Sequence, residues 1–86
     1  MTIKIVNKLD ELTLEALRNI GNQRLIITER IRTYLDNTNA DQLRKEIGEI
    51  KSVQQLRIIQ GAGVRKDIRS FFLSRYVILS GAQEVI

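Results

Sequence analysis

The residues with the clearest chemical potential lie between Ser52 and Phe72, in the run SVQQLRIIQGAGVRKDIRSFF. Two glycines flank a small residue at Gly61-Ala62-Gly63, where the chain can turn tightly and expose consecutive backbone amides. A helix that begins just after this turn would add unsatisfied N–H groups and the positive end of its dipole. Basic side chains follow at once, namely Arg65, Lys66 and Arg69. This combination predicts a phosphate-binding site.

The same glycines also have a purely structural interpretation. Glycine commonly ends a helix because it adopts the left-handed conformation without strain. The segment from Gly61 to Gly63 would then simply join two helices in a tight αα-hairpin. The glycine pattern alone leaves both interpretations open.

The charge distribution favours an anionic partner for the second half of the chain. Residues 1–50 carry eight basic and eight acidic residues, whereas residues 51–86 carry six basic and two acidic ones. The whole net charge of +4 therefore belongs to the later segment. A one-sided positive region is typical of proteins that bind nucleic acid or a membrane surface. A solvated basic surface with no partner has the same composition.

Composition excludes several kinds of site. The chain contains neither cysteine nor histidine, so disulfides, thiolate metal sites and histidine-based acid–base catalysis are impossible. The acidic residues Asp41, Glu46 and Glu49 alternate with Arg44 and Lys45, a spacing typical of a solvated helix face. We therefore predict that the protein is not an enzyme and needs no cofactor or metal.

The apolar runs are too short for a membrane span. Val77-Ile78-Leu79 is one of the longest, whereas a helix needs about 20 apolar residues to cross a bilayer. The start of the chain, MTIKIVNK, lacks the apolar core of a signal peptide. We therefore expect a cytoplasmic protein with no membrane partner.

The spacing of apolar residues predicts an all-α protein of about five short helices in a compact orthogonal bundle. A short extended arm is expected at residues 2–6, because no partner strand is visible. The first helix would have its N-cap at Asn7 or Asp10 and stop at Gly21. Its apolar positions are Leu9, Leu12, Ala16, Leu17 and Ile20.

The second and third helices are separated by the turn-forming residues 36–39. The second would begin at Asn22 or Gln23, and the third would be capped by Asn39. The second helix should bury Ile27, Ile31, Tyr34 and Leu35. The third should bury Leu43, Ile47 and Ile50.

Ser52 and Gln55 have the spacing of a reciprocal capping box, which predicts the start of a fourth helix. Its buried stripe would be Val53, Leu56 and Ile59. A fifth helix would follow the glycine turn, extend to about residue 79 and bury Val64, Ile68, Phe71 and Phe72. The run YVIL at residues 76–79 has high β propensity, so it could instead leave the helix.

Several of these segments together resemble a known DNA-binding motif. Ser52-Val53-Gln54-Gln55-Leu56, then Gln60, the glycine turn and a basic helix resemble a helix-hairpin-helix motif. The broader pattern resembles the tandem version of this motif in the competence-type DNA receptor family. Its first copy and junction are represented by Leu14-Glu15-Ala16-Leu17, Ile20-Gly21, the run from Ile31 to Tyr34, and Ile50-Lys51. The resemblance covers most of residues 4–72.

The resemblance implies a single domain, residues 1–86, that binds duplex DNA through its phosphates without reading sequence. Residues 8–36 would form a degenerate first hairpin unit, 37–50 an inserted helix, and 51–80 the second helix-hairpin-helix unit. It implies that the amides come from Gly61, Ala62 and Gly63 and the positive charge from Arg65, Lys66 and Arg69. Weaker candidates from the first copy are Asn22, Gln23 and Arg24.

The sequence departs from the family pattern in both hairpins. The first copy has one glycine, Gly21, so its phosphate-binding turn is incomplete. In the second copy, Asp67 stands where the family has a small residue at the helix crossing, and we expect Ile68 to take over the packing. Gln60 replaces the common proline.

Two alternatives to DNA binding remain open. The first is a protein-interaction or assembly module in which the hairpins are only structural, including a homo-oligomer that docks through TIKIV or YVIL. The second is a conventional helix-turn-helix around residues 43–56. Its apolar positions after Gly48 fall about one place out of register.

Overall fold

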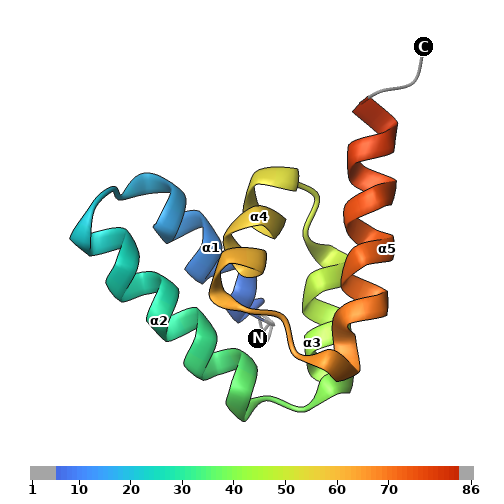
Figure 1. The fold of residues 1–86 in the computed structure, drawn as a ribbon, viewed down its shortest axis with the longest axis horizontal. Coiled ribbons are helices and arrows are strands. Elements are labelled where there is room, and N and C mark those ends of the chain that lie inside the picture. Colours follow the sequence, from blue (N-terminus) through green and yellow to red (C-terminus); the bar gives the residue numbers. More distant parts are fainter. Residues whose placement is uncertain (1–5, 84–86) are drawn as a thin grey trace, which may run out of the picture.

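The computed structural model describes residues 6–83 of the 86-residue chain. The predicted N-terminal arm at residues 2–6 lies outside this range except for Val6. The described residues form five α-helices and no strand, which confirms the predicted all-α class (Figure 1). The helices are α1 (Lys8–Arg18), α2 (Asn22–Asn37), α3 (Ala40–Glu49), α4 (Val53–Ala62) and α5 (Lys66–Gln83).

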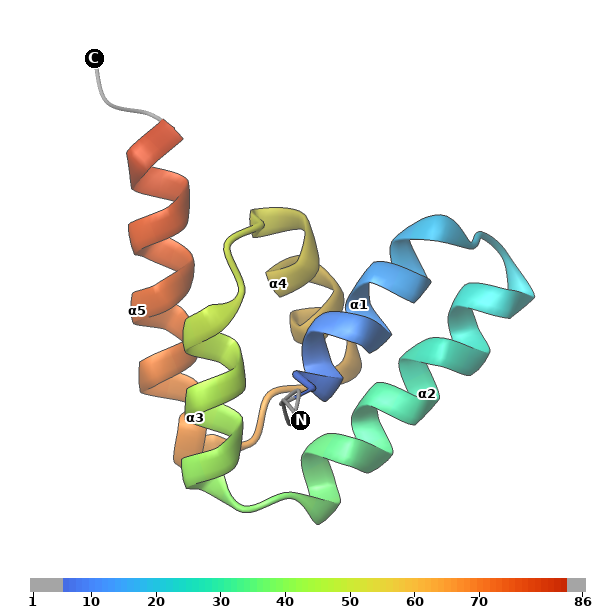
Figure 2. The same ribbon diagram turned by 180° about the vertical axis from the view of Figure 1, so that it is seen from behind.

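The helices fall into two groups that share one core. The α1 and α2 helices form a hairpin, and α4 packs against both of them. The α3 helix lies alongside α5, whose C-terminal half extends past the end of α3 (Figures 1 and 2). Among the described residues, α5 packs against α3 and α4, and its opposite side carries the exposed residues Ser70, Ser74, Val77 and Gly81.

Local signals position most helix starts as predicted. The side chain of Asn7 accepts a hydrogen bond from the Asp10 amide at 2.9 Å, and that of Asn39 accepts from Gln42 at 2.8 Å. Each satisfies one of the otherwise unpaired N–H groups of a first turn. The predicted buried stripes of α2, α3 and α4 also lie in the core, with Ile31, Leu43 and Leu56 among the fully buried residues.

The predicted end of α1 is wrong. The helix stops at Arg18, and Ile20, expected on its buried face, is 80% exposed. Asn19 already has extended backbone angles, and its N–H donates to the Ala16 carbonyl. Gly21 has φ of +64° and serves as the N-cap of α2. The glycine therefore starts the second helix rather than ending the first.

The capping box at the start of α4 is only half formed. The hydroxyl of Ser52 accepts from the Gln55 amide at 3.5 Å, as predicted. The side chain of Gln55, however, is buried and donates to Asp10 at 2.8 Å and to Thr13 at 2.9 Å. It joins α4 to α1 instead of closing the cap.

The run YVIL stays helical, since α5 continues to Gln83. Tyr76 and Leu79 are partly buried against the core, whereas Val77 and Ile78 point outward. Helical periodicity explains this alternation, because residues 72, 76 and 79 lie on one side of α5. Tertiary packing on that side outweighs the β propensity of the run.

Glu46 is the main departure from the predicted solvated face of α3. It is only 2% exposed, and its carboxylate accepts hydrogen bonds from the Leu9 amide, the Gln42 side chain and the Tyr34 hydroxyl. The pKa of Tyr34 is raised to about 12, mainly because the phenol is partly buried and also because it bonds the carboxylate of Glu46. The contact joins α1, α2 and α3 through one buried carboxylate.

Candidate functional site

The glycine turn lies at the C-terminal end of α4, and two of its three residues are inside the helix. Gly61 and Ala62 belong to the last turn, where N–H groups point back toward carbonyls four residues earlier. Gly63 ends the helix with φ of +103°, and its N–H donates to Ile59 at 3.2 Å and Gln60 at 3.1 Å. The three amides predicted to bind phosphate are therefore directed into α4.

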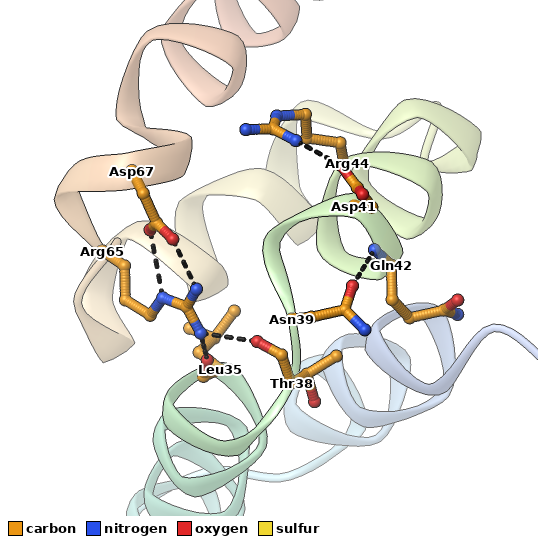
Figure 3. Close-up of polar contacts among 8 residues, drawn as sticks. All are labelled: Leu35, Thr38, Asn39, Asp41, Gln42, Arg44, Arg65 and Asp67. Atoms are coloured by element: carbon orange, nitrogen blue, oxygen red, sulfur yellow. Dashed lines mark hydrogen bonds and ion pairs between the residues drawn. The ribbon is translucent and has the colours of Figure 1, made fainter.

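The side chain of Arg65 links the two helical groups, because it bonds both the end of α2 and Asp67 in the first turn of α5 (Figure 3). Its Nη1 donates to the carbonyls of Leu35 at 2.6 Å and Thr38 at 2.5 Å, at the C-terminal end of α2. Its Nε and Nη2 donate to the carboxylate of Asp67 at 3.1 and 2.5 Å. A cation at a helix C-terminus interacts favourably with the helix dipole. Four of the guanidinium's hydrogen bonds are thus made within the protein.

Asp67 places a negative charge in the first turn of α5. Its hydrogen bonds from Arg65 are the main reason that the pKa of Asp67 is lowered from its ordinary value. The carboxylate occupies the helix end that a phosphate would need, and like charges repel there. The neighbouring Ile68 is fully buried, as the sequence predicted for the helix crossing.

Lys66 and Arg69 are the predicted charge partners that remain available. Both side chains are exposed. Within residues 6–83, neither takes part in a side-chain hydrogen bond or an ion pair. They lie near the N-terminal end of α5, on its solvent side, because positions three apart share a helix face.

The first hairpin also uses its arginine for structure. The Nε of Arg24 donates to Ala16 at 2.9 Å and to Asn19 at 2.8 Å, at the C-terminal end of α1. Asn22 and Gln23 are exposed, and the first turn of α2 has neither an acidic residue nor a side-chain cap. The candidate site ranked as weaker in the sequence therefore has the more open helix N-terminus.

A third arginine repeats the arrangement. Arg75 on α5 donates to the carbonyl of Ile50, the C-cap of α3, at 3.2 Å. Arginines from other segments thus lie at the C-terminal ends of α1, α2 and α3. The charge distribution along the sequence does not reveal these contacts, because a structural arginine and a surface arginine contribute the same charge.

Comparisons of the chain with protein-family profiles, curated proteins and solved structures find no match. The helix-hairpin-helix resemblance consequently stays a prediction. Among the helices described between residues 6 and 83, none is long and apolar enough to cross a membrane.

The solvent side of α5 carries a feature that the sequence indicated only through YVIL. Leu73, Val77 and Ile78 are 47%, 65% and 59% exposed, and with Ser74 they line a shallow hollow. We call these three apolar residues the outer face of α5. A second apolar group lies at the α1–α2 turn, away from α5 (Figure 1), and includes Ile20 and Leu25.

Proposed function

We propose that this protein is an assembly module that associates with a second copy of itself through the outer face of α5. The observation that carries the proposal is the exposure of Leu73, Val77 and Ile78 within two turns of one helix. Contiguous exposed apolar surface on a small protein marks an interaction site more often than scattered single residues do. Burying such residues removes apolar area from water at about 25 cal/mol per Å².

The composition of this side of α5 favours an identical partner. Small residues, Ser70 and Gly81, flank the apolar centre and are exposed. Two copies of one helix can therefore approach without large side chains colliding at either end. A symmetric dimer requires a patch that complements itself, and an apolar centre with small flanks meets that requirement.

The test is the mass of the protein in solution from micromolar to millimolar concentration, measured by sedimentation equilibrium. We expect the wild-type chain to form a dimer and Val77→Asp to remain monomeric with unchanged helical circular dichroism. Leu25→Asp is the matched control, because Leu25 on α2 is 64% exposed and Val77 is 65% exposed. A wild-type monomer throughout, or loss of the dimer only in Leu25→Asp, would contradict the proposal.

Duplex DNA binding remains the second candidate, supported by the free charges of Lys66 and Arg69. The Gly61–Gly63 amides and Arg65 are engaged elsewhere, so fewer phosphate contacts are expected than the sequence suggested. If two phosphates are neutralised, a plot of the logarithm of the binding constant against the logarithm of the salt concentration should have a slope of about −1.8.

A titration of duplex DNA at several salt concentrations tests this candidate. The Lys66→Ala/Arg69→Ala variant should lose the salt-dependent binding. A variant of two exposed basic residues elsewhere, Arg32→Ala/Lys45→Ala, should keep it. Equal binding by both variants, or no binding at low salt, would exclude the second candidate.

A further inference from the structure

We propose that the two copies pair their α5 helices antiparallel, with Arg69 of each copy at the C-terminal end of the partner's α5. This inference rests on the proposed function and adds the orientation and register of the contact. The relevant residues are Ser70, Ser74, Val77 and Gly81, at successive spacings of four, three and four, and all four are exposed. That spacing forms one narrow seam on a helix, as in two-stranded helix pairs.

The small residues along the seam fix where the helices can approach most closely. Ser70 and Gly81 are exposed, and a side-chain carbon added at Gly81 would have no neighbour within 4 Å. If the two-fold axis passes between residues 75 and 76, Ser70 faces the partner's Gly81. In the same register Ser74 faces the partner's Val77, and Leu73 and Ile78 lie on the two flanks of the seam. The smallest residues then meet at the two ends of the contact, and Val77 of each copy lies near its middle.

The charges select the antiparallel orientation. A parallel pair would place Lys66 and Arg69 beside the same two cations of the partner. The antiparallel register separates the two Lys66 positions by about 28 Å along the helix axis, at 1.5 Å per residue. Charges that far apart are screened at physiological salt, where the Debye length is about 8 Å.

The C-terminal end of α5 supplies the complementary charge. The last carbonyls of any helix lack partners within the helix and carry the negative end of its dipole. Arginines from other segments donate to the carbonyls at the ends of α1, α2 and α3, whereas among residues 6–81 no side chain donates a hydrogen bond to the carbonyls of residues 78–81 near the end of α5. In the proposed register Arg69 lies beside residues 81–83 of the partner. It would repeat between copies the contact that Arg65 makes within one copy.

Disulfide cross-linking tests the orientation cleanly, because the natural chain has no cysteine. Ser70→Cys and Gly81→Cys each alter an exposed position of α5. An equimolar mixture of the two variants should form a mixed disulfide, since that bond needs Cα atoms about 4.4–6.8 Å apart. Ser70→Cys alone should not form one, because position 70 of one copy and position 70 of the other would be about 16 Å apart along the axis. Thr33→Cys mixed with Gly81→Cys measures random collisions.

The charge contact has its own measurement. Arg69→Ala should weaken the dimer about fivefold, because each dimer loses two contacts of roughly 0.5 kcal/mol at helix ends. Lys45→Ala, which removes an exposed cation of α3, should leave the dissociation constant unchanged.

The outcomes separate the inference from the function on which it rests. A wild-type monomer overturns the proposed function. A dimer that Val77→Asp disrupts, but in which Ser70→Cys cross-links to itself, retains the function and overturns the antiparallel orientation. A dimer with neither cross-link, or an Arg69→Ala variant of unchanged affinity, also overturns this inference.

Discussion

The two hairpins of this protein use the same two residue types for different tasks. Each contains a glycine with positive φ, and each has an arginine shortly afterwards that donates to a helix C-terminus. Gly21 begins α2, whereas Gly63 ends α4. Arg24 closes its own hairpin, whereas Arg65 reaches across to the first one. A glycine followed by an arginine therefore does not distinguish a phosphate ligand from a structural brace.

The hairpins also differ in how their second helices begin. The first turn of α2 is uncapped and free of acidic residues, whereas that of α5 contains Asp67 paired with Arg65. An anion would be opposed by Asp67 at α5 and by no acidic residue in the first turn of α2. The hairpin with more glycines is consequently the less suitable one for phosphate.

Arg65→Ala should produce the largest loss of stability, because it breaks the link between the hairpins. The variant leaves the carbonyls of Leu35 and Thr38 without their charged donor and Asp67 without its partner. We expect a roughly 30-fold fall in the ratio of folded to unfolded protein, measured by urea unfolding, since charged hydrogen bonds are among the stronger ones. Lys66→Ala, next along the chain, should change stability by less than about 0.5 kcal/mol. Equal effects of the two variants would show that Arg65 is not a brace.

Gly63→Ala should cost about 1–2 kcal/mol, because φ of +103° strains any residue with a side chain. Gly21→Ala should cost a similar amount at φ of +64°. Neither position has an atom within 4 Å of an added side-chain carbon, so backbone strain alone determines the loss. Thermal unfolding of both variants measures it. A neutral result at either position would mean that its hairpin does not need a positive φ.

The contact between the first hairpin and α3 should weaken as the pH becomes alkaline. The pKa of Tyr34 rises from 10 to about 12 on folding, so the neutral phenol is favoured in the folded state. Its contribution is fully present below pH 10 and is lost as the pH rises to about 12. We expect the loss to be roughly 1 kcal/mol, since partial solvent exposure weakens the interaction.

Urea unfolding across the alkaline range tests this dependence by comparing two variants. Tyr34→Phe should lack the part of the alkaline decline that belongs to Tyr34. Tyr76→Phe should keep it, because Tyr76 contacts the exposed side chain of Arg57 instead. Identical pH profiles would rule out the assignment to Tyr34.

Features set by neighbours in the chain could be predicted from the sequence. Asn7 and Asn39 cap helices through residues three positions away, and helical spacing places Ile68 in the core. These outcomes depend on local hydrogen bonds and on the 3.6-residue period. Five helices and much of the core follow from such signals.

Features set by distant residues could not be predicted in this way. Arg65 and Leu35 are 30 positions apart, and Glu46 is buried by partners from α1 and α2. The residues next to Glu46 are charged, so its local pattern is that of a solvated face. The amides and Arg65 of the predicted phosphate site are engaged by contacts that only the folded chain creates.

Gly61→Ala has the smallest expected effect and tests the interpretation of the glycine turn most directly. Gly61 is exposed within the last turn of α4, and an added side-chain carbon would have no neighbour within 4 Å. Alanine should therefore stabilise the protein by about 0.5–1 kcal/mol, because it reduces the entropy of the unfolded chain. Any duplex DNA affinity should be unchanged, since the amide at position 61 is already directed into the helix. A destabilised variant that also loses DNA binding would show instead that both glycines shape a phosphate-binding turn, and the two hairpins would then differ in function as well as in structure.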